Sequence, residues 1–309
     1  EKRESKMYLV RFVLWFLRFV GDITNEFIEK NVPFMCASIS FYAFFSLFPL
    51  LLGLIMIFSI FLGIQGFEQT LIDSLKNVIP IFDEQDDEFL KSFFDSLTSN
   101  RLATSTVAGI GLLFASSAVF GTIRKSINFI WEIDKKRTFF EERKIDFSML
   151  FIASFLLISS FALTTGLSFL SELISITFPD SPLIDQNIWN RLALLVPPFL
   201  TFLVFLICFW WLPNIELSFI SVLPAAILAT LAEEINKMVF ILYLRNFSGI
   251  SGSIYGGVSA IIVFMAFIYI SSIILLIGAQ ISARNTVYLN IRQQNKQNKI
   301  LESSLERLS

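Results

Sequence analysis

Residues 254–281 read IYGGVSAIIVFMAFIYISSIILLIGAQI and contain no charged side chain. A bilayer core about 30 Å thick requires roughly 20 apolar residues in a helix, so this run is long enough to cross it. The rest of the chain has the same character, since 55% of its 309 residues are hydrophobic and only 16% are charged. Soluble domains carry about 25% charged residues. The sequence therefore predicts an integral membrane protein.

Other runs of similar length and low charge precede this one. Counted together they predict an all-α, polytopic protein with six transmembrane helices. The predicted spans are residues 34–63, 102–123, 147–171, 192–215, 217–244 and 254–281. They form a transmembrane domain over residues 34–283, preceded by a cytoplasmic segment (1–33) and followed by a polar cytoplasmic tail (284–309), in which we expect a brief amphipathic helix at most.

Lysine and arginine predict the orientation of the spans, because short cytoplasmic segments are enriched in these residues. Of the 24 such residues, 18 lie before the first span, between the second and third spans, or in the tail. Both termini are therefore expected in the cytoplasm. No small-residue cleavage site follows an early apolar run, so we expect no removed signal peptide.

Two segments outside the spans have amphipathic patterns. Residues 7–20 are apolar apart from a narrow polar stripe, which predicts an interfacial helix with Arg11 and Arg18 contacting anionic lipid. A helix packed beneath the bundle is an equally acceptable interpretation. The first extracytoplasmic loop, residues 65–100, contains two further helical patterns. These two helices either cap an outward-facing cavity or, more simply, lie on the outer leaflet.

The fifth predicted span is interrupted by Glu233, Glu234 and Lys237. A charge at the bilayer centre costs about 2.5–3.5 kcal/mol on insertion scales, so these groups require partners, water or the interface. At about 100° per residue, the three share one helical face. The opposite face is apolar and suits lipid contact: Leu228, Leu231, Ile235, Val239 and Leu242.

This charged face is expected to line the bundle interior or a wet cavity, with Lys237 bridging one carboxylate. The other carboxylate is then in excess, and three states are open to it: pairing with an arginine elsewhere, binding a cation, or protonation. Charges that lie at the outer interface without any transport role are the alternative.

Prolines and glycines near the spans suggest broken helices of the kind that transporters use. Pro49 in the first span, and Gly252 and Gly256 before the sixth, are the gating or kink candidates. Because glycine and proline are common in membrane helices, close packing explains them as well. The other prolines that interrupt predicted spans are Pro197, Pro198 and Pro224.

The chain contains no histidine and only two cysteines, both within apolar runs. The lack of histidine excludes imidazole-based catalysis and histidine-ligated zinc, and two cysteines cannot build an all-cysteine zinc site. We therefore expect no enzymatic activity, no metal site and no cofactor.

Four segments resemble the YihY/virulence factor BrkB family of bacterial inner-membrane proteins, formerly called ribonuclease BN-like. They are ASISFYAFFSLFPLLL (37–52), GTIRKSINFIWEIDKKR (121–137), EINKMVFILY (234–243) and residues 253–283. The resemblance covers roughly residues 30–285. It implies six helices with cytoplasmic termini in a bacterial inner membrane, and a suspected role in transport or lipid translocation.

By position, the family pattern also marks Tyr42, Asn128 and Tyr255, together with Glu234 and Lys237. Gln280 stands where the family usually has glutamate, so a proton-coupling role is not expected at that position. Packing roles for the tyrosines and a helix-cap role for Asn128 are the simpler alternatives.

The leading functional hypothesis is a transporter or a permease that translocates a lipid or other amphiphile. Its substrate or cavity candidates are Glu234, Lys237, Glu233, Tyr42, Tyr255 and Asn128. Membrane lipids are the expected partners. A structural or regulatory membrane protein is the alternative. A ribonuclease is least favoured, because the richest carboxylate cluster lies in the extracytoplasmic loop, away from RNA, and no nucleic-acid partner is expected.

Overall fold

The computed structural model describes residues 18, 21–46, 101–134, 137–177, 186–247 and 256–306, and all regular structure within these ranges is helical. Two helices cover residues 21–29 and Val32–Ser46. The others are α5 (Arg101–Ile130), α6 (Phe139–Thr177), α7 (Gln186–Trp211), α8 (Phe219–Phe247) and α9 (Gly256–Glu306). The predicted all-α class is thus confirmed for the described part of the chain.

Several predicted features lie outside the described residues. They are the interfacial pattern of residues 7–17 with Arg11, both amphipathic patterns of residues 65–100, Pro49, Gly252 and Tyr255. Arg18 is described and is exposed, and Gly256 is the first residue of α9.

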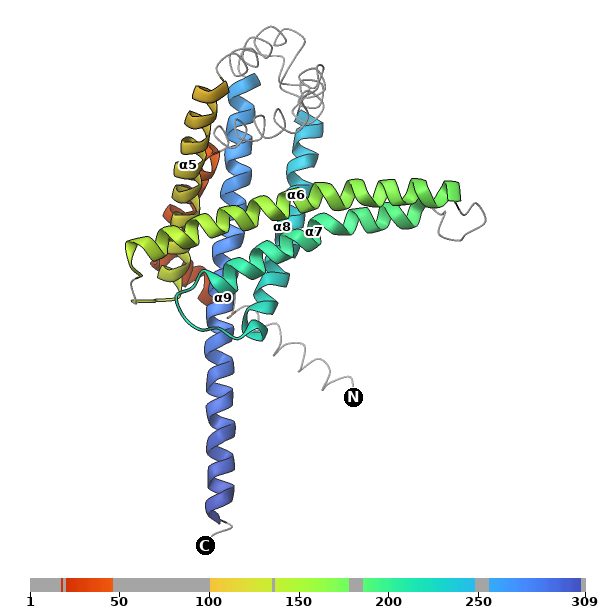
Figure 1. Cartoon of the computed structure of the whole chain (residues 1–309). Coiled ribbons are helices and arrows are strands. Elements are labelled where there is room, and N and C mark those ends of the chain that lie inside the picture. The colour runs from red at the N-terminus through yellow and green to blue at the C-terminus, as the bar shows by residue number, and fades with distance from the viewer. Residues whose placement is uncertain are drawn as a thin grey trace.

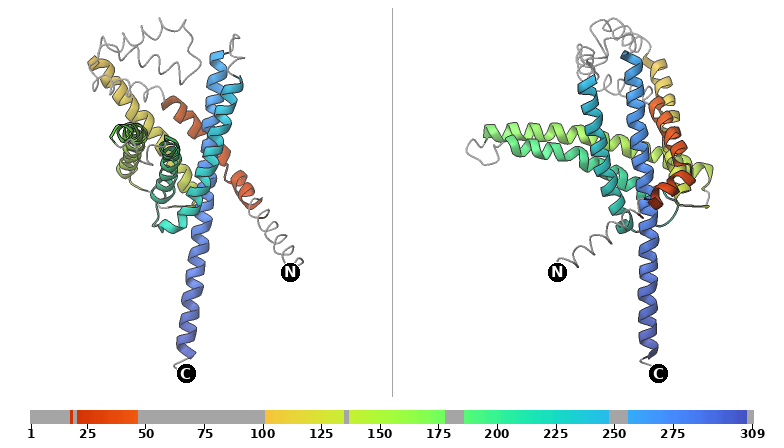
Figure 2. Two further views of the ribbon diagram at one scale, coloured as in Figure 1. Left: turned by 90° about the vertical axis from the view of Figure 1, so that its right-hand side faces the viewer. Right: turned by 180° about the vertical axis from the view of Figure 1, so that it is seen from behind.

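Two pairs of helices cross one another in the body of the molecule. α6 and α7 run side by side and cross α8 and α9, which pack along each other (Figure 1). Figure 2 shows the same crossing from another side, where α6 and α7 are seen nearly end-on. α5 packs against α6 and α9. The last part of α9 extends away from the other helices as a single helix.

Small residues allow α7, α8 and α9 to approach closely. Ala225, Ala226 and Ala229 form one buried face of α8, at the spacing of successive helical turns. Gly278 of α9 faces Phe209 of α7, whose ring is fully buried. Membrane helices use such small residues because they bring backbones and large side chains into van der Waals contact. The position of Phe209 therefore depends on the missing side chain of Gly278.

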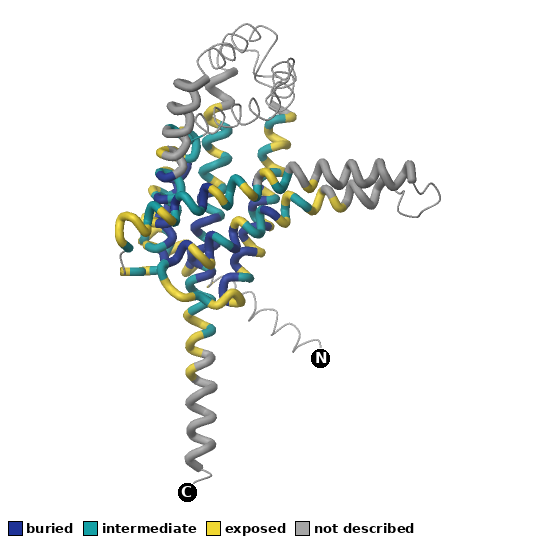
Figure 3. Tube along the Cα trace, viewed as in Figure 1, coloured by how far each residue is buried: buried dark blue, intermediate teal, exposed yellow. Residues whose placement is uncertain are grey.

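The buried residues gather where the helix pairs cross (Figure 3). The core cluster draws its largest fully buried side chains from several helices: Ile127 and Ile130 of α5, Phe209 of α7, Val222 of α8 and Leu276 of α9, with Leu212 just beyond α7. Large apolar side chains are also widely exposed, as at Leu194 and Leu195 of α7. Soluble monomers rarely expose contiguous apolar surface, whereas a lipid-facing surface is made of it.

Two described stretches are long and apolar enough to cross a membrane. They are Leu194–Trp211 of α7, with a mean hydropathy of 2.2, and Ile261–Ile291 of α9, whose most apolar 18-residue window has a mean hydropathy of 2.7. Only 28% of the first stretch and 22% of that window are buried, so neither is enclosed like the core helix of a soluble protein. The count of six spans stays a prediction.

The ends of the helices differ from the sequence-based boundaries in ways that local chemistry explains. α7 ends at Trp211, before the predicted 215, because Pro213 has no N–H and restricts the residue before it. α9 continues through the tail to Glu306, so the expectation of only a brief helix there is wrong. No glycine or proline follows Gly278 to stop that helix.

The prolines that lie both in predicted spans and in the described part of the chain do not break their helices. α7 is continuous through Pro197 and Pro198, and α8 is continuous through Pro224. Neighbouring helices and hydroxyl side chains satisfy the backbone groups that proline frees in membrane helices.

Adding one methyl group at Gly278 tests the packing between α7 and α9. A Cβ atom there would lie 2.9 Å from Cε2 of Phe209 and closer still to Cζ. Gly278→Ala should therefore destabilise the detergent-solubilised protein by about 1–3 kcal/mol, measured by thermal unfolding. Gly21→Ala is the matched control, since nothing lies within 4 Å of its Cβ position, and it should leave stability unchanged. Equal melting temperatures for the two variants would contradict this packing.

Candidate functional site

The charged residues of α8 divide into a pair and a single carboxylate. Lys237 Nζ lies 2.7 Å from Glu234 Oε1 and also donates a hydrogen bond of 2.9 Å to Thr201 Oγ1 on α7. Of the two possible partners for Lys237, the structure thus selects Glu234. The ion pair is partly buried and connects α8 to α7.

Glu233 is the carboxylate in excess. It is only 7% exposed, and its Oε1 accepts a hydrogen bond of 2.8 Å from the hydroxyl of Ser271 on α9. Asn236 donates a hydrogen bond of 3.0 Å to the same hydroxyl. The second oxygen, Oε2, is buried and has no hydrogen-bond partner among the described residues. Burying an ionised carboxylate without a counter-charge is costly, so this oxygen is chemically available to a proton or a cation.

The two faces of α8 agree with the pattern expected from sequence. Thr230, Glu233 and Asn236 are buried against neighbouring helices. The residues assigned to the lipid-facing side are all exposed by 51–62%: Leu228, Leu231, Ile235, Val239 and Leu242.

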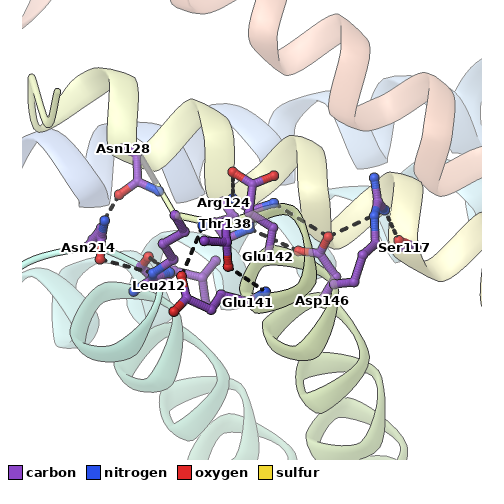
Figure 4. Close-up of polar contacts among 11 residues, drawn as sticks. Ser117, Arg124, Asn128, Thr138, Glu141, Glu142, Asp146, Leu212 and Asn214 are labelled. Carbon is purple, nitrogen blue, oxygen red and sulfur yellow. Dashed lines mark hydrogen bonds and ion pairs between the residues drawn. The ribbon is translucent and has the colours of Figure 1, made fainter. Parts of the chain in front are cut away.

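A second polar cluster joins α5 to α6. Arg124 and Asp146 are 3% and 0% exposed, and Arg124 Nε lies 3.0 Å from Asp146 Oδ1 (Figure 4). Arg124 also lies 3.1 Å from Glu142 Oε1, and Arg143 lies 3.5 Å from Asp146 Oδ2. Gly121 leaves room for this arrangement, because a Cβ there would meet the Asp146 carboxylate at 3.2 Å.

Local sequence fixes where α6 begins. The backbone N–H of Thr138 donates to Glu141 Oε2 at 2.9 Å, and the N–H of Glu141 donates to Thr138 Oγ1 at 3.5 Å. This reciprocal pair is a capping box, a Ser/Thr residue followed by Glu three positions later. It sets the first turn of α6 and therefore the positions of Phe139 and Phe140.

Amide side chains hold the turn after α7 against the end of α5. Asn128 Oδ1 accepts a hydrogen bond of 2.9 Å from the backbone N–H of Asn214, and Arg137 Nε donates to Asn214 Oδ1 at 2.9 Å (Figure 4). Just after the end of α5, Glu132 has a positive φ of 54° and the backbone N–H of Ile133 donates a hydrogen bond to the Asn128 carbonyl. Asn128 therefore connects the end of α5 to the turn after α7, which is a structural role.

Ion pairs bring together the three segments that the sequence assigns to one side of the membrane. Lys30 lies 2.7 Å from Glu26 and 2.8 Å from Glu132, and Arg284 of α9 lies 2.8 Å from Glu26. Burial alone raises the pKa of Glu26, but hydrogen bonds from Lys30 and Arg284 outweigh it and lower the pKa below its ordinary value of 4.5.

A cavity of about 730 Å³ lies beside the Arg124 cluster. Its lining combines aromatic rings, small residues and two basic side chains: Tyr42, Phe114, Ser117, Ala118, Gly121, Thr122, Lys125, Phe139, Phe140, Arg143 and Phe147. Arg143 donates a hydrogen bond to the hydroxyl of Ser117 and lies 5.2 Å from the ring centroid of Phe139. Pockets of this volume accommodate small organic ligands.

The sequence-based candidates thus fall in different places. Glu233, Glu234 and Lys237 gather on α8, whereas Tyr42 lines the cavity, to which no described residue of α8 contributes. Gln280 is fully buried, and its amide atoms have no hydrogen-bond partner among the described residues.

Sequence reasoning missed Arg143, Asp146 and the phenylalanines of α6, and treated Lys125 only as a residue that sets orientation. Glu142 and Asp146, four residues apart at the start of an apolar helix, are the signal that points to a buried cluster.

The cluster predicts a loss of stability in acid. The hydrogen bond from Arg124 lowers the pKa of Glu142 below 4.5, against the opposing effect of burial. A carboxyl whose pKa is lowered in the folded state stabilises the fold above its unfolded value, and this contribution disappears as the pH falls through the lowered pKa. The melting temperature in detergent should therefore decline as the pH falls below about 4.5.

Glu142→Gln should show a smaller decline over the same pH range, whereas the exposed residue Glu29, changed to glutamine, should leave the full decline in place. An unchanged pH profile in Glu142→Gln would contradict a stabilising role for its ion pair.

Comparison with known proteins identifies the family. The model of the virulence factor BrkB family matches residues 23–300. A UPF0761 membrane protein of Pseudoalteromonas translucida is 27% identical over 273 residues, which cover 87% of this chain and 85% of the relative. A UPF0761 membrane protein of Aliivibrio salmonicida is 27% identical over 263 residues, which cover 84% of this chain and 81% of the relative.

A relative of the same name from Chlorobium luteolum is 24% identical over 270 residues, but the chain spans only 60% of that longer protein. No solved structure matches the chain. Because the family match extends over most of the chain and the relatives are named bacterial membrane proteins, this protein is a membrane protein that belongs to the virulence factor BrkB family.

Proposed function

We propose that this protein is a permease rather than an enzyme, and that it moves a lipid or another amphiphile across the bacterial inner membrane, with both termini in the cytoplasm. The observation that carries the proposal is the buried carboxylate of Glu233, which has one oxygen without a partner among the described residues.

A carboxylate in this position is expensive to keep without a function. Ionisable residues within membrane segments are rare, face the interior of a bundle, and mark ion or substrate pathways. Glu233 of α8 lies at the contact with α9, where the hydroxyl of Ser271 donates a hydrogen bond to it. Neither Lys237 nor an arginine in the described residues forms an ion pair with it, since Lys237 is paired with Glu234.

The polar group also joins the helices that would have to move. Lys237 connects α8 to Thr201 of α7, and Glu233 connects α8 to Ser271 of α9. Protonation or cation binding at Glu233 changes the strength of its hydrogen bond to α9. That change gives a coupled ion a direct effect on the contact between α8 and α9, which a permease requires.

Lipid translocation in proteoliposomes tests the proposal. The probe is a phospholipid with a fluorophore on its acyl chain, and the measurement is the rate at which the inner-leaflet probe becomes accessible to an external quencher. Because a hydrogen bond to a charged group contributes about 1.5–3 kcal/mol, Glu233→Gln should lower the protein-dependent rate about tenfold or more.

Glu216→Gln is the matched control, because Glu216 is exposed in the turn before α8, and it should translocate at the rate of the unmodified protein. The proposal is overturned if the unmodified protein is no faster than empty liposomes, or if Glu233→Gln retains the full rate with an unchanged melting temperature.

A further inference from the structure

The cavity beside the Arg124 cluster is built from one face of α5 and one face of α6. The lining residues of α5 follow the spacing of a single helical face: Phe114, Ser117, Ala118, Gly121, Thr122 and Lys125. Those of α6 do the same: Phe139, Phe140, Arg143 and Phe147. Tyr42 from the helix Val32–Ser46 completes the wall.

The chemistry of this lining changes along α5. Phe114 lies within the predicted second span, and Lys125 lies just beyond its cytoplasmic end. At about 1.5 Å per residue, the two are separated by about 16 Å along the helix axis. This length is close to half of a bilayer core about 30 Å thick. The cavity therefore extends from acyl-chain depth to headgroup depth in one leaflet.

The headgroup end of the cavity has a positive charge in excess. Three basic residues lie here beside only two carboxylates: Arg124, Arg143 and Lys125 against Glu142 and Asp146. Both arginines are engaged with these carboxylates, whereas Lys125 is exposed and forms no ion pair with a described residue. The free charge at the cavity is thus that of a lysine, which binds phosphate as a point charge.

The rest of the cavity lining is apolar and open. The rings of Phe114 and Phe140 are 81% and 83% exposed, and that of Phe139 is 64% exposed. A soluble anion would leave the three aromatic rings exposed to water, and a neutral lipid would give no counter-charge to Lys125. An anionic lipid covers the rings and also supplies the counter-charge.

We propose that this cavity binds one anionic membrane lipid, with the phosphate at Lys125 and the apolar part of the lipid along the rings of Phe114, Phe139 and Phe140. Arg143 positions the wall, because its contacts with Asp146, Ser117 and Phe139 hold the start of α6 against α5. As the cytoplasmic loading site of a permease the cavity rests on the proposed function, but lipid binding itself is measured without any transport.

Photolabelling in nanodiscs tests the proposal. The full chain is placed in phosphatidylcholine nanodiscs that contain a trace of phosphatidylglycerol with a photoreactive group on its acyl chain, and labelled peptides are mapped by mass spectrometry. Label is expected on the segments of α5 and α6 that line the cavity. An electrostatic contribution typical of one lysine near an anionic headgroup predicts that Lys125→Gln lowers this labelling about fivefold.

Lys144→Gln is the matched control, since Lys144 is an exposed lysine close by on α6 that does not line this cavity, and it should retain full labelling. A phosphatidylcholine carrying the same photoreactive group should label these segments at the low level of Lys125→Gln. Ala118→Phe, which fills the cavity with a ring, should reduce labelling by both lipids, with folding checked by melting temperature.

Three results would overturn the proposal. The first is equal labelling of these segments by the two lipids, and the second is full labelling of Lys125→Gln. The third is complete competition by millimolar inorganic phosphate, which would identify a soluble anion as the occupant. A permease without this site would still translocate lipid with Lys125→Gln at the full rate, so failure here is distinguishable from failure of the proposed function.

Discussion

The buried ion pair between Arg124 and Asp146 is the interaction on which the arrangement of α5 and α6 depends. Two side chains of opposite charge that are 3% and 0% exposed must remain together, because removing either one takes the closest counter-charge from a buried group. Gly121 permits their close approach. With this contact in place, α5 and α6 keep the register that brings Lys125, the exposed rings and the small residues to one cavity.

The largely apolar protein thus contains two polar groups with different properties, the cluster between α5 and α6 and the charged residues of α8. The α5–α6 cluster is well satisfied, since each charge has at least one partner or faces the cavity. The α8 group is not, because one oxygen of Glu233 has no partner among the described residues. The first group is suited to holding a fixed binding site, and the second is suited to changing its protonation or cation occupancy. These properties match the loading site and the coupling site of the proposed permease.

The sequence predicted those features that follow from helical periodicity and charge. The exposed face of α8, from Leu228 to Leu242, and the inward direction of Glu233 follow from about 100° per residue. Whether Lys237 pairs with Glu233 or Glu234 was open, because both spacings are compatible with a helix. The contact between Arg124 and Asp146 could not be predicted, because it joins residues 22 positions apart through a turn whose geometry the sequence does not specify. The length of α9 was underestimated because its polar composition was read as a tail.

The most direct test of this account is a double-mutant cycle on Arg124→Met and Asp146→Leu, measured by reversible unfolding in mixed micelles. If the buried pair holds α5 against α6, each single variant should lose up to about 3–5 kcal/mol, because the other buried charge keeps only one, more exposed partner, Glu142 or Arg143. The double variant should then be more stable than the sum of the two losses by about 0.5–3 kcal/mol of coupling. Strictly additive losses would show that the two charges act independently and would contradict the account.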